Sequence, residues 1–158
     1  MADATYQEGA EGGLNLKAYG VEDLQIISSL VQDAVLTAAD LTWRPKERRL
    51  VFLMNRFRWE DAPRAEARKR PYERVRALLV IDGVLRVGSQ GVDRGAGDEV
   101  LSVLSLNWTQ GEDAAGSVTL VLAGDGAIRA EVECLDVTLK DVTRPYLAPS
   151  RHMPKHPD

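Results

Sequence analysis

The sequence predicts an α+β domain that is predominantly antiparallel β, as a curved sheet or partly open barrel of seven or eight strands, with one N-terminal amphipathic helix. Two observations support this prediction. Apolar residues recur at three- and four-residue spacing over residues 21–34, which is the period of a helix. Beyond Ala34, apolar and polar residues mostly alternate, and turn signals separate the alternating segments.

The length and composition indicate one ordinary folded domain. A chain of 158 residues can bury a substantial core. We expect a disordered arm over residues 1–13, which are polar and Gly-rich, and a single globular domain over residues 14–146. Residues 147–158 are expected to form a tail, because four of the seven prolines lie from Pro145 onward and prevent regular structure.

Composition also predicts a cytoplasmic protein without a membrane partner. No segment approaches the roughly 18 apolar residues of a membrane-spanning helix. The acidic N-terminus is unlike a signal peptide, which begins with basic residues and continues with an apolar stretch. The single cysteine, Cys134, falls in a strand-like pattern, so we predict a buried structural thiol in a reducing compartment.

The first half of the chain should hold a strand, the helix and two longer strands. Alternation over residues 14–18 predicts a short strand, and Glu22 and Asp23 favour a helix start after it. An extended segment over residues 35–43 and a charged turn should then lead to a strand over residues 50–59. The beginning of that last strand is apolar on both faces, which indicates a central position in the sheet.

The second half is predicted to contain hairpins and irregular loops. Residues 60–73 are charged and lack a broad apolar stripe, so we expect a mobile loop. Asp82-Gly83 should be the turn of a hairpin between residues 74–81 and 84–90, because this dipeptide tolerates positive φ angles. We expect three further strands, over residues 100–108, 118–122 and 128–134, and a second hairpin turn at residues 124–126. Residues 88–97 should be irregular and residues 110–116 a loop. The pattern over residues 135–142 fits either a strand or a helix.

The sequence offers no catalytic constellation, metal site or cofactor motif. Both histidines, His152 and His156, lie in the Pro-rich tail, where Pro154 between them opposes a helix that would align two ligands. Without a histidine elsewhere, Ser/His/Asp and Cys/His nucleophile systems have no base. We therefore predict no metal, no cofactor and no catalytic residue.

Charge is distributed unevenly along the chain, which has a net charge of −4. Residues 44–76 carry twelve basic and five acidic residues, whereas both flanking regions are acidic. Aromatic residues interleave with this basic block, so it could track a nucleic-acid backbone. We favour ion pairing with the acidic remainder of the molecule, because a nucleic-acid binder is usually basic overall.

Three segments of the chain are distinctive in combination: the helix EDLQIISSLVQDAV, the stretch LTWRPKERRL and the strand end MNRFRWE. Together they resemble a small family of uncharacterised bacterial proteins catalogued only as a domain of unknown function. The resemblance spans roughly residues 14–146. It implies a bacterial cytoplasmic protein and directs attention to the polar and aromatic residues of these motifs, but it implies no activity.

The most plausible function is a non-enzymatic binding or interaction domain that engages a protein or an anionic partner. We place the binding surface around residues 43–59, on these seven candidates: Trp43, Arg44, Asn55, Arg56, Phe57, Arg58 and Trp59. The alternative is an enzyme that acts on a small anionic substrate with Arg56 as a two-pronged anion clamp. Arg56 could equally pair with Asp33 or Glu60 in a structural role, which we favour.

Overall fold

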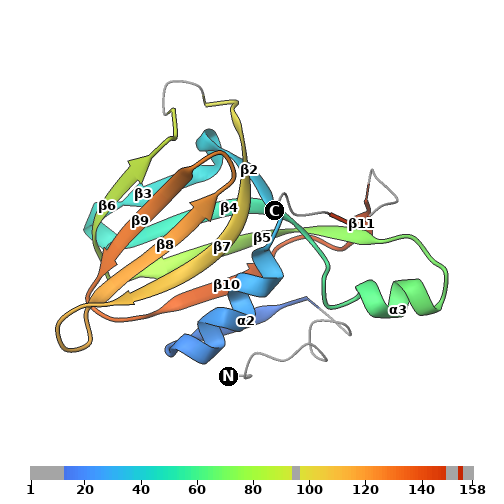
Figure 1. Ribbon diagram of the computed structural model, residues 1–158, viewed down its shortest axis with the longest axis horizontal. Coiled ribbons are helices and arrows are strands. Elements are labelled where there is room, and N and C mark those ends of the chain that lie inside the picture. Colours follow the sequence, from blue (N-terminus) through green and yellow to red (C-terminus); the bar gives the residue numbers. More distant parts are fainter. Residues whose placement is uncertain (1–12, 94–96, 149–152, 155–158) are drawn as a thin grey trace.

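The computed structural model describes residues 13–93, 97–148, 153 and 154, and these contain two α-helices, two short 3-10 helices and eleven strands (Figure 1). The helices are α2 (Val21–Val31), α3 (Ala62–Ala67), η1 (Ala38–Asp40) and η2 (Pro45–Glu47). The strands are β1 (Asn15–Ala18), β2 (Val35–Thr37), β3 (Leu41–Arg44), β4 (Arg49–Phe57), β5 (Glu73–Asp82), β6 (Val84–Gln90), β7 (Val100–Gln110), β8 (Gly116–Leu122), β9 (Gly126–Val132), β10 (Val137–Asp141) and β11 (Tyr146–Leu147).

All the strands belong to one antiparallel sheet, which does not close into a barrel. Its order is β1-β10-β5-β4-β2-β7-β8-β9-β6, while β3 pairs with β4 and β11 pairs with β5. The sheet therefore has open edges at β1 and β6, and β3 leaves a further edge beside β4. The class predicted from the sequence, a mostly antiparallel sheet with an N-terminal helix, is confirmed at this level.

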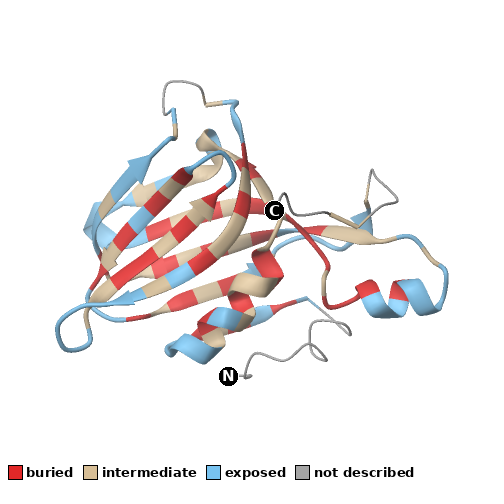
Figure 2. Ribbon diagram, viewed as in Figure 1, coloured by how far each residue is buried: buried red, intermediate tan, exposed pale blue. Residues whose placement is uncertain are grey.

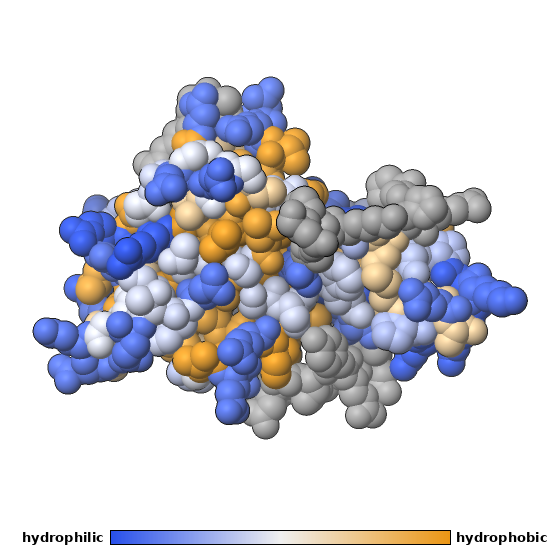
Figure 3. Space-filling view, viewed as in Figure 1, coloured by the Kyte–Doolittle hydropathy of each residue, from blue (hydrophilic) through white to orange (hydrophobic). Residues whose placement is uncertain are grey.

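The hydrophobic core lies between the sheet and α2. Leu24, Ile27 and Leu30 on one stripe of α2 are buried, and the helix packs against β7, β1 and β4. Buried residues alternate with less buried residues along the strands, as Figure 2 shows for β8 and β9. Hydrophobic residues also reach the surface in the middle of the visible face, over β7 and β8 (Figure 3).

Strand β4 defines the two faces of the sheet. From Leu50 to Arg56 its even-numbered residues are buried and its odd-numbered residues are half-buried. We call the side of Leu50 and Arg56 the core face and the side of Asn55 the outer face. A strand in the middle of a sheet accepts apolar residues on both sides, which explains why the apolar start of this segment predicted its central position.

The number of strands is larger than the seven or eight predicted. The segment 35–43, predicted as one extended stretch, is interrupted by η1, where Asp40 accepts hydrogen bonds from the backbone and hydroxyl of Thr37 at 2.9 Å. This local cap divides the segment into β2 and β3. The undecided segment 135–142 contains β10, and β11, which pairs with β5, spans the boundary between the predicted domain and the predicted tail.

The predicted hairpin at Asp82-Gly83 is wrong, because β5 and β6 pair with different neighbours. β5 pairs with β4 and β10, and β6 pairs with β9. A type I′ turn requires positive φ at both central residues, and here only Gly83 has one, at 71°. The dipeptide instead forms a bend between two parts of the sheet. The second predicted hairpin, at Gly124-Asp125-Gly126, is confirmed between β8 and β9.

Two further predictions need correction. Residues 60–73, expected as a mobile loop, contain α3, which projects beyond the ends of β4 and β5 (Figure 1) and buries only Ala62 and Ala65. Such a narrow apolar stripe gave no helical signal. Cys134 is exposed rather than buried, because β9 ends at Val132 and the chain turns there towards β10.

One predicted element has different bounds in the structure, and other predictions fall on residues that the structure does not describe. The helix predicted to end at residue 34 ends at Val31, and Asp33 takes a positive φ of 62°. Apart from Gly13, the predicted arm lies outside the described residues, as do both histidines of the predicted tail. In the described part of the chain neither helix is long and apolar enough to cross a membrane. The cytoplasmic location stays a prediction.

The close approach of two strands predicts a specific requirement for glycine. A Cβ at Gly116 would lie 2.5 Å from the carbonyl oxygen of Thr109 and 2.5 Å from the ring of Trp108. We expect Gly116→Ala to lower the free energy of unfolding by about 1–3 kcal/mol, because backbone and ring must both move. Gly88→Ala on β6 is the matched control, since its Cβ would meet nothing within 4 Å. Urea unfolding measures both, and equal stability of the two variants would contradict the prediction.

Candidate functional site

The seven predicted site residues do not form one surface. Three of them are buried: Arg56, Phe57 and Arg58. Three are half-buried, namely Trp43, Asn55 and Trp59, and Arg44 is exposed. Alternation along β4 separates them, because Arg56 points to the core face and Asn55 to the outer face. Trp43 lies on another strand, at the open side of the sheet.

Arg56 is completely buried between two carboxylates. Its Nη1 and Nη2 donate to the two oxygens of Glu60 at 2.8 and 2.7 Å, and its Nε and Nη2 donate to the two oxygens of Asp141 at 3.0 and 2.9 Å. Asp141 also accepts a hydrogen bond from the backbone N–H of Leu14 at 3.0 Å. The guanidinium therefore links β4 to β10 and to the residue before β1.

This geometry removes Arg56 from the candidate ligand-binding residues. Burial by itself would lower the pKa of Arg56, but its hydrogen bonds to Glu60 and Asp141 outweigh burial and raise that pKa, so the charge persists. A fully buried cation with two carboxylates is already neutralised and is closed to solvent. The clamp role is therefore not supported. The alternative pairing with Glu60 is confirmed, whereas Asp33 is not a partner of Arg56.

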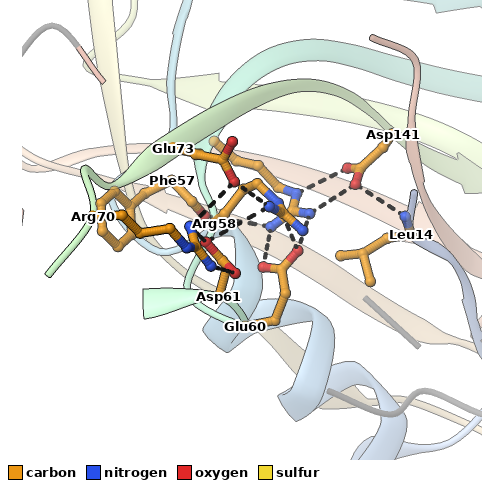
Figure 4. A network of polar contacts seen from close by, with 9 residues as sticks. Leu14, Phe57, Arg58, Glu60, Asp61, Arg70, Glu73 and Asp141 are labelled. Carbon is orange, nitrogen blue, oxygen red and sulfur yellow. Dashed lines mark hydrogen bonds and ion pairs between the residues drawn. The ribbon is translucent and has the colours of Figure 1, made fainter. Parts of the chain in front are cut away.

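Further ion pairs lie beside Arg56 and hold residues 60–73, which we call the α3 lobe (Figure 4). Arg58 contacts Glu73 at 2.5 Å and Asp61 at 3.7 Å, and Arg70 donates to both oxygens of Asp61 at 2.7 and 2.5 Å. We call the whole set the buried ion network: Arg56, Arg58, Glu60, Asp61, Arg70, Glu73 and Asp141. The hydrogen bond from Arg70, followed by the nearby charge of Arg58, lowers the pKa of Asp61 despite its burial.

The aromatic candidates also have structural contacts. The rings of Phe57 and Trp59 pack edge to face with centroids 4.6 Å apart, and Tyr72 lies 5.4 Å from Phe57. Trp59 donates its indole N–H to the carbonyl of Gln32 at 2.8 Å, which joins the end of β4 to the C-terminal end of α2. These rings are engaged with one another and with α2, so they do not form a free stacking platform.

Trp43 lines a cleft at the open side of the sheet. The backbone N–H of Val84 donates to the carbonyl of Arg48 at 2.8 Å, so the start of β6 meets the turn between β3 and β4. Beyond that point the described residues form no ladder between β3 and β6. The space between them is a cleft of about 330 Å³. We call it the seam cleft, lined by Leu41, Trp43, Val87, Ser89, Val92 and Ile128.

The walls of the seam cleft come from the core side of both strands. Trp43 is paired with Leu50, and Val87 is paired with Ala130, whose side chains are both buried. Trp43 and Val87 would thus be interior residues of a closed barrel, and they stay partly exposed because the sheet is open. Of the lining residues, sequence reasoning found only Trp43. Val87 and Ser89 were missed because β6 was assigned to a hairpin with β5. Leu41, Val92 and Ile128 come from three other segments, which local pattern does not bring together.

Charged residues at the η2 end of the seam cleft are mostly paired. Arg44 lies 3.6 Å from Glu47, Arg86 lies 2.5 Å from Glu131, and Arg48 pairs with Glu133. Lys46 on η2, which lies against β6, is exposed and forms no ion pair with the described residues. Across the basic block 44–76, six of the twelve basic side chains form ion pairs with carboxylates of the described chain: Arg44, Arg48, Arg49, Arg56, Arg58 and Arg70.

The described residues hold no group of three or more His, Cys, Asp or Glu side chains with metal-binding geometry. His152 and His156 lie outside the described residues, so the predicted absence of a metal stays a prediction for the tail.

The fold and the seam cleft define a class of protein: an open antiparallel sheet that is sealed on one face by a helix and carries an apolar cleft between two strand edges. The chain belongs to the family described as "Protein of unknown function (DUF2948)", whose model matches residues 14–156. The predicted resemblance to a family of unknown function is therefore confirmed. Neither the curated proteins nor the solved structures provide a match to this chain. The bacterial source stays a prediction.

Removing the central cation should destabilise the fold strongly. We expect Arg56→Met to lower the free energy of unfolding by about 3–5 kcal/mol, because Asp141 then remains buried without this counter-charge and Glu60 keeps only the more distant Arg58, at 3.7 Å. The matched control is Arg49→Met on the same strand, which breaks a partly exposed pair with Asp82 and should cost about 0–1 kcal/mol. Urea unfolding of both variants checks this. Similar losses in the two variants would show that burial of the pair is not decisive.

The lowered pKa of Asp61 predicts a pH dependence. Its ordinary value is 3.8, and a carboxylate with a lower pKa in the folded state stabilises fully above that value. The stabilisation is lost as the pH falls through the lowered pKa. The stability difference between wild type and Asp61→Asn, measured by urea unfolding, should thus be largest at neutral pH and shrink well below pH 3.8. A difference that stays constant with pH would contradict the ion pair with Arg70.

Proposed function

We propose that this protein is a binding domain that holds an extended segment of a partner protein in the seam cleft. The observation that carries the proposal is the pair of strand edges, on β3 and β6, that form no ladder with another described strand and that flank an apolar floor. Extended peptides add to exposed sheet edges through main-chain hydrogen bonds, and pockets for alternate side chains supply specificity. The cleft offers both features in one place.

The chemistry of the cleft defines the kind of segment that fits. Trp43, Val87 and Ile128 would surround an apolar side chain that points inward, and burying it removes apolar surface from water. Lys46 at the η2 end favours an acidic residue on the same side of the bound segment. Because β3 has four residues, the added ladder is short, and we expect dissociation constants on the order of micromolar.

An enzymatic function has no support in the geometry of the predicted residues. The cation proposed to hold an anionic substrate, Arg56, is buried and neutralised by Glu60 and Asp141. A single-strand nucleic-acid site around residues 43–59 is likewise not favoured, because Phe57 is buried and Trp59 uses its indole N–H within the protein.

A phage-displayed library of random short peptides tests the proposal. Peptides selected on the wild-type protein should share an apolar residue in an extended pattern, and Val87→Asp should abolish their binding because it places a charge in the cleft. Leu85→Asp is the matched control, since Leu85 lies on the same strand but is 55% exposed. Isothermal titration calorimetry measures the affinities.

Two results would contradict the proposal. Selected peptides that bind Val87→Asp and wild type equally well would place the site elsewhere. Failure of the selection, combined with self-association of the wild type that Val87→Asp abolishes in sedimentation experiments, would assign the cleft to a second copy of the chain.

A further inference from the structure

The outer face of the sheet carries a second cleft, on the side of β4 opposite the core. It has a volume of about 290 Å³ and lies over β2, β4 and β5, with Tyr146 of β11 at its border. Its polar lining consists of Thr37, Asp40, Asn55, Arg76 and Tyr146. We call it the outer-face cleft. None of its lining residues contributes to the seam cleft.

Arg74 lies beside this cleft as a half-buried cation that is bonded to neutral oxygens. Its Nε donates to the side-chain oxygen of Asn55 at 2.6 Å, and its Nη2 donates to the carbonyls of Asn55 and Asp33 at 3.1 and 3.3 Å. Burial lowers the pKa of Arg74, although the nearby charge of Asp33 counteracts this effect in part. In the described chain no carboxylate forms an ion pair with Arg74.

Arg74 differs in its partners from the buried residues Arg56 and Arg58. Arg56 and Arg58 are each held by at least two carboxylates, as expected for charges removed from water. Arg74 donates hydrogen bonds only to neutral oxygens, and the nearby charge of Asp33 offsets the effect of burial only in part, so its positive charge raises the potential in the adjoining cleft. An anion bound in that cleft would add to the counter-charge that Asp33 supplies.

Two donors are available in the cleft itself. Arg76, two residues further along β5 on the same face, is exposed, and its guanidinium forms no hydrogen bond or ion pair with the described residues. The hydroxyl of Tyr146 accepts a hydrogen bond from the side-chain N–H of Asn55, so its own proton remains to be donated. Arg74, Asn55 and Tyr146 thus form a chain of hydrogen bonds that orients this hydroxyl.

The negative charge in the lining is already engaged. Asp40 accepts hydrogen bonds from the backbone and the hydroxyl of Thr37, both at 2.9 Å, as the cap of η1. The remaining lining includes the apolar side chains of Val35, Leu53 and Val100. A ligand that fills the cleft must therefore combine an anionic head with an apolar portion.

We infer that the outer-face cleft binds a small organic oxyanion, a carboxylate or phosphate whose oxygens contact Arg76 and the hydroxyl of Tyr146 and whose apolar portion packs on Val35, Leu53 and Val100. The inference is independent of the peptide site. It does not require the seam cleft, and either site can fail without the other.

Titration of the full-length protein with acetate, butyrate, inorganic phosphate and phenyl phosphate tests this inference. At constant ionic strength, the backbone amide signals of Leu53, Asn55 and Tyr146 should shift saturably in heteronuclear NMR spectra. Butyrate should bind about tenfold more tightly than acetate, because two additional methylene groups become buried. A gain for phenyl phosphate over inorganic phosphate would identify a phosphate head group, and a gain for butyrate a carboxylate.

Two variants and two controls define the site. We expect Arg76→Gln to weaken binding about tenfold, because a charge-assisted hydrogen bond is lost, and Tyr146→Phe to weaken it while keeping the ring. Arg86→Gln removes the same charge from β6, and Val87→Asp blocks the seam cleft. Both should leave the affinity unchanged.

Three results would overturn the inference. The first is the absence of saturable shifts at Asn55 and Tyr146 with all four anions. The second is an equal loss of affinity in Arg76→Gln and Arg86→Gln, which would indicate general charge attraction. Equal affinities for the small and the larger anions would rule out the organic class of ligand.

Discussion

The pairing of Arg56 with Glu60 and Asp141 is the interaction on which the rest of the structure depends. β4 runs through the centre of the sheet, and its alternation directs residue 56 into the core. An arginine there is tolerated only with counter-charges, and these come from the segment before α3 and from the end of β10. Asp141 also accepts a hydrogen bond from Leu14, so one buried cation fixes the position of β1, β10 and the start of the α3 lobe.

The same network explains how a short helix with little apolar surface is ordered. α3 buries only two alanines, which is too little to hold six residues against the loss of chain entropy. Asp61 at its N-terminal end is fixed instead by Arg58 and Arg70, whose partners include Glu73 on β5. Ion pairs therefore hold the end of the molecule where the hydrophobic core stops, whereas α2 seals the opposite region through apolar contacts.

The break at η1 has the largest consequence for function. A continuous strand over residues 35–43 could bridge β4 and β7 along its whole length. Because the Thr37–Asp40 cap interrupts it, β2 lies between β4 and β7, whereas β3 pairs with β4 alone among the described strands. The open edge of β3, on which Trp43 lies, follows from this local cap. The cap also places Asp40 in the lining of the outer-face cleft, so both candidate sites share a cause.

The sequence by itself determined the local structure with a clear period: the helix stripe around Ile27, the alternating strands and the Gly124-Asp125-Gly126 hairpin. It also predicted that Arg56 pairs with Asp33 or Glu60, and of these two carboxylates Glu60 is the partner. Only the tertiary structure decided that Asp141 completes the pair, that β6 joins β9, and that Trp43 faces an open seam. These features depend on contacts between residues far apart in the chain, and local pattern carries no information on which strand edges meet.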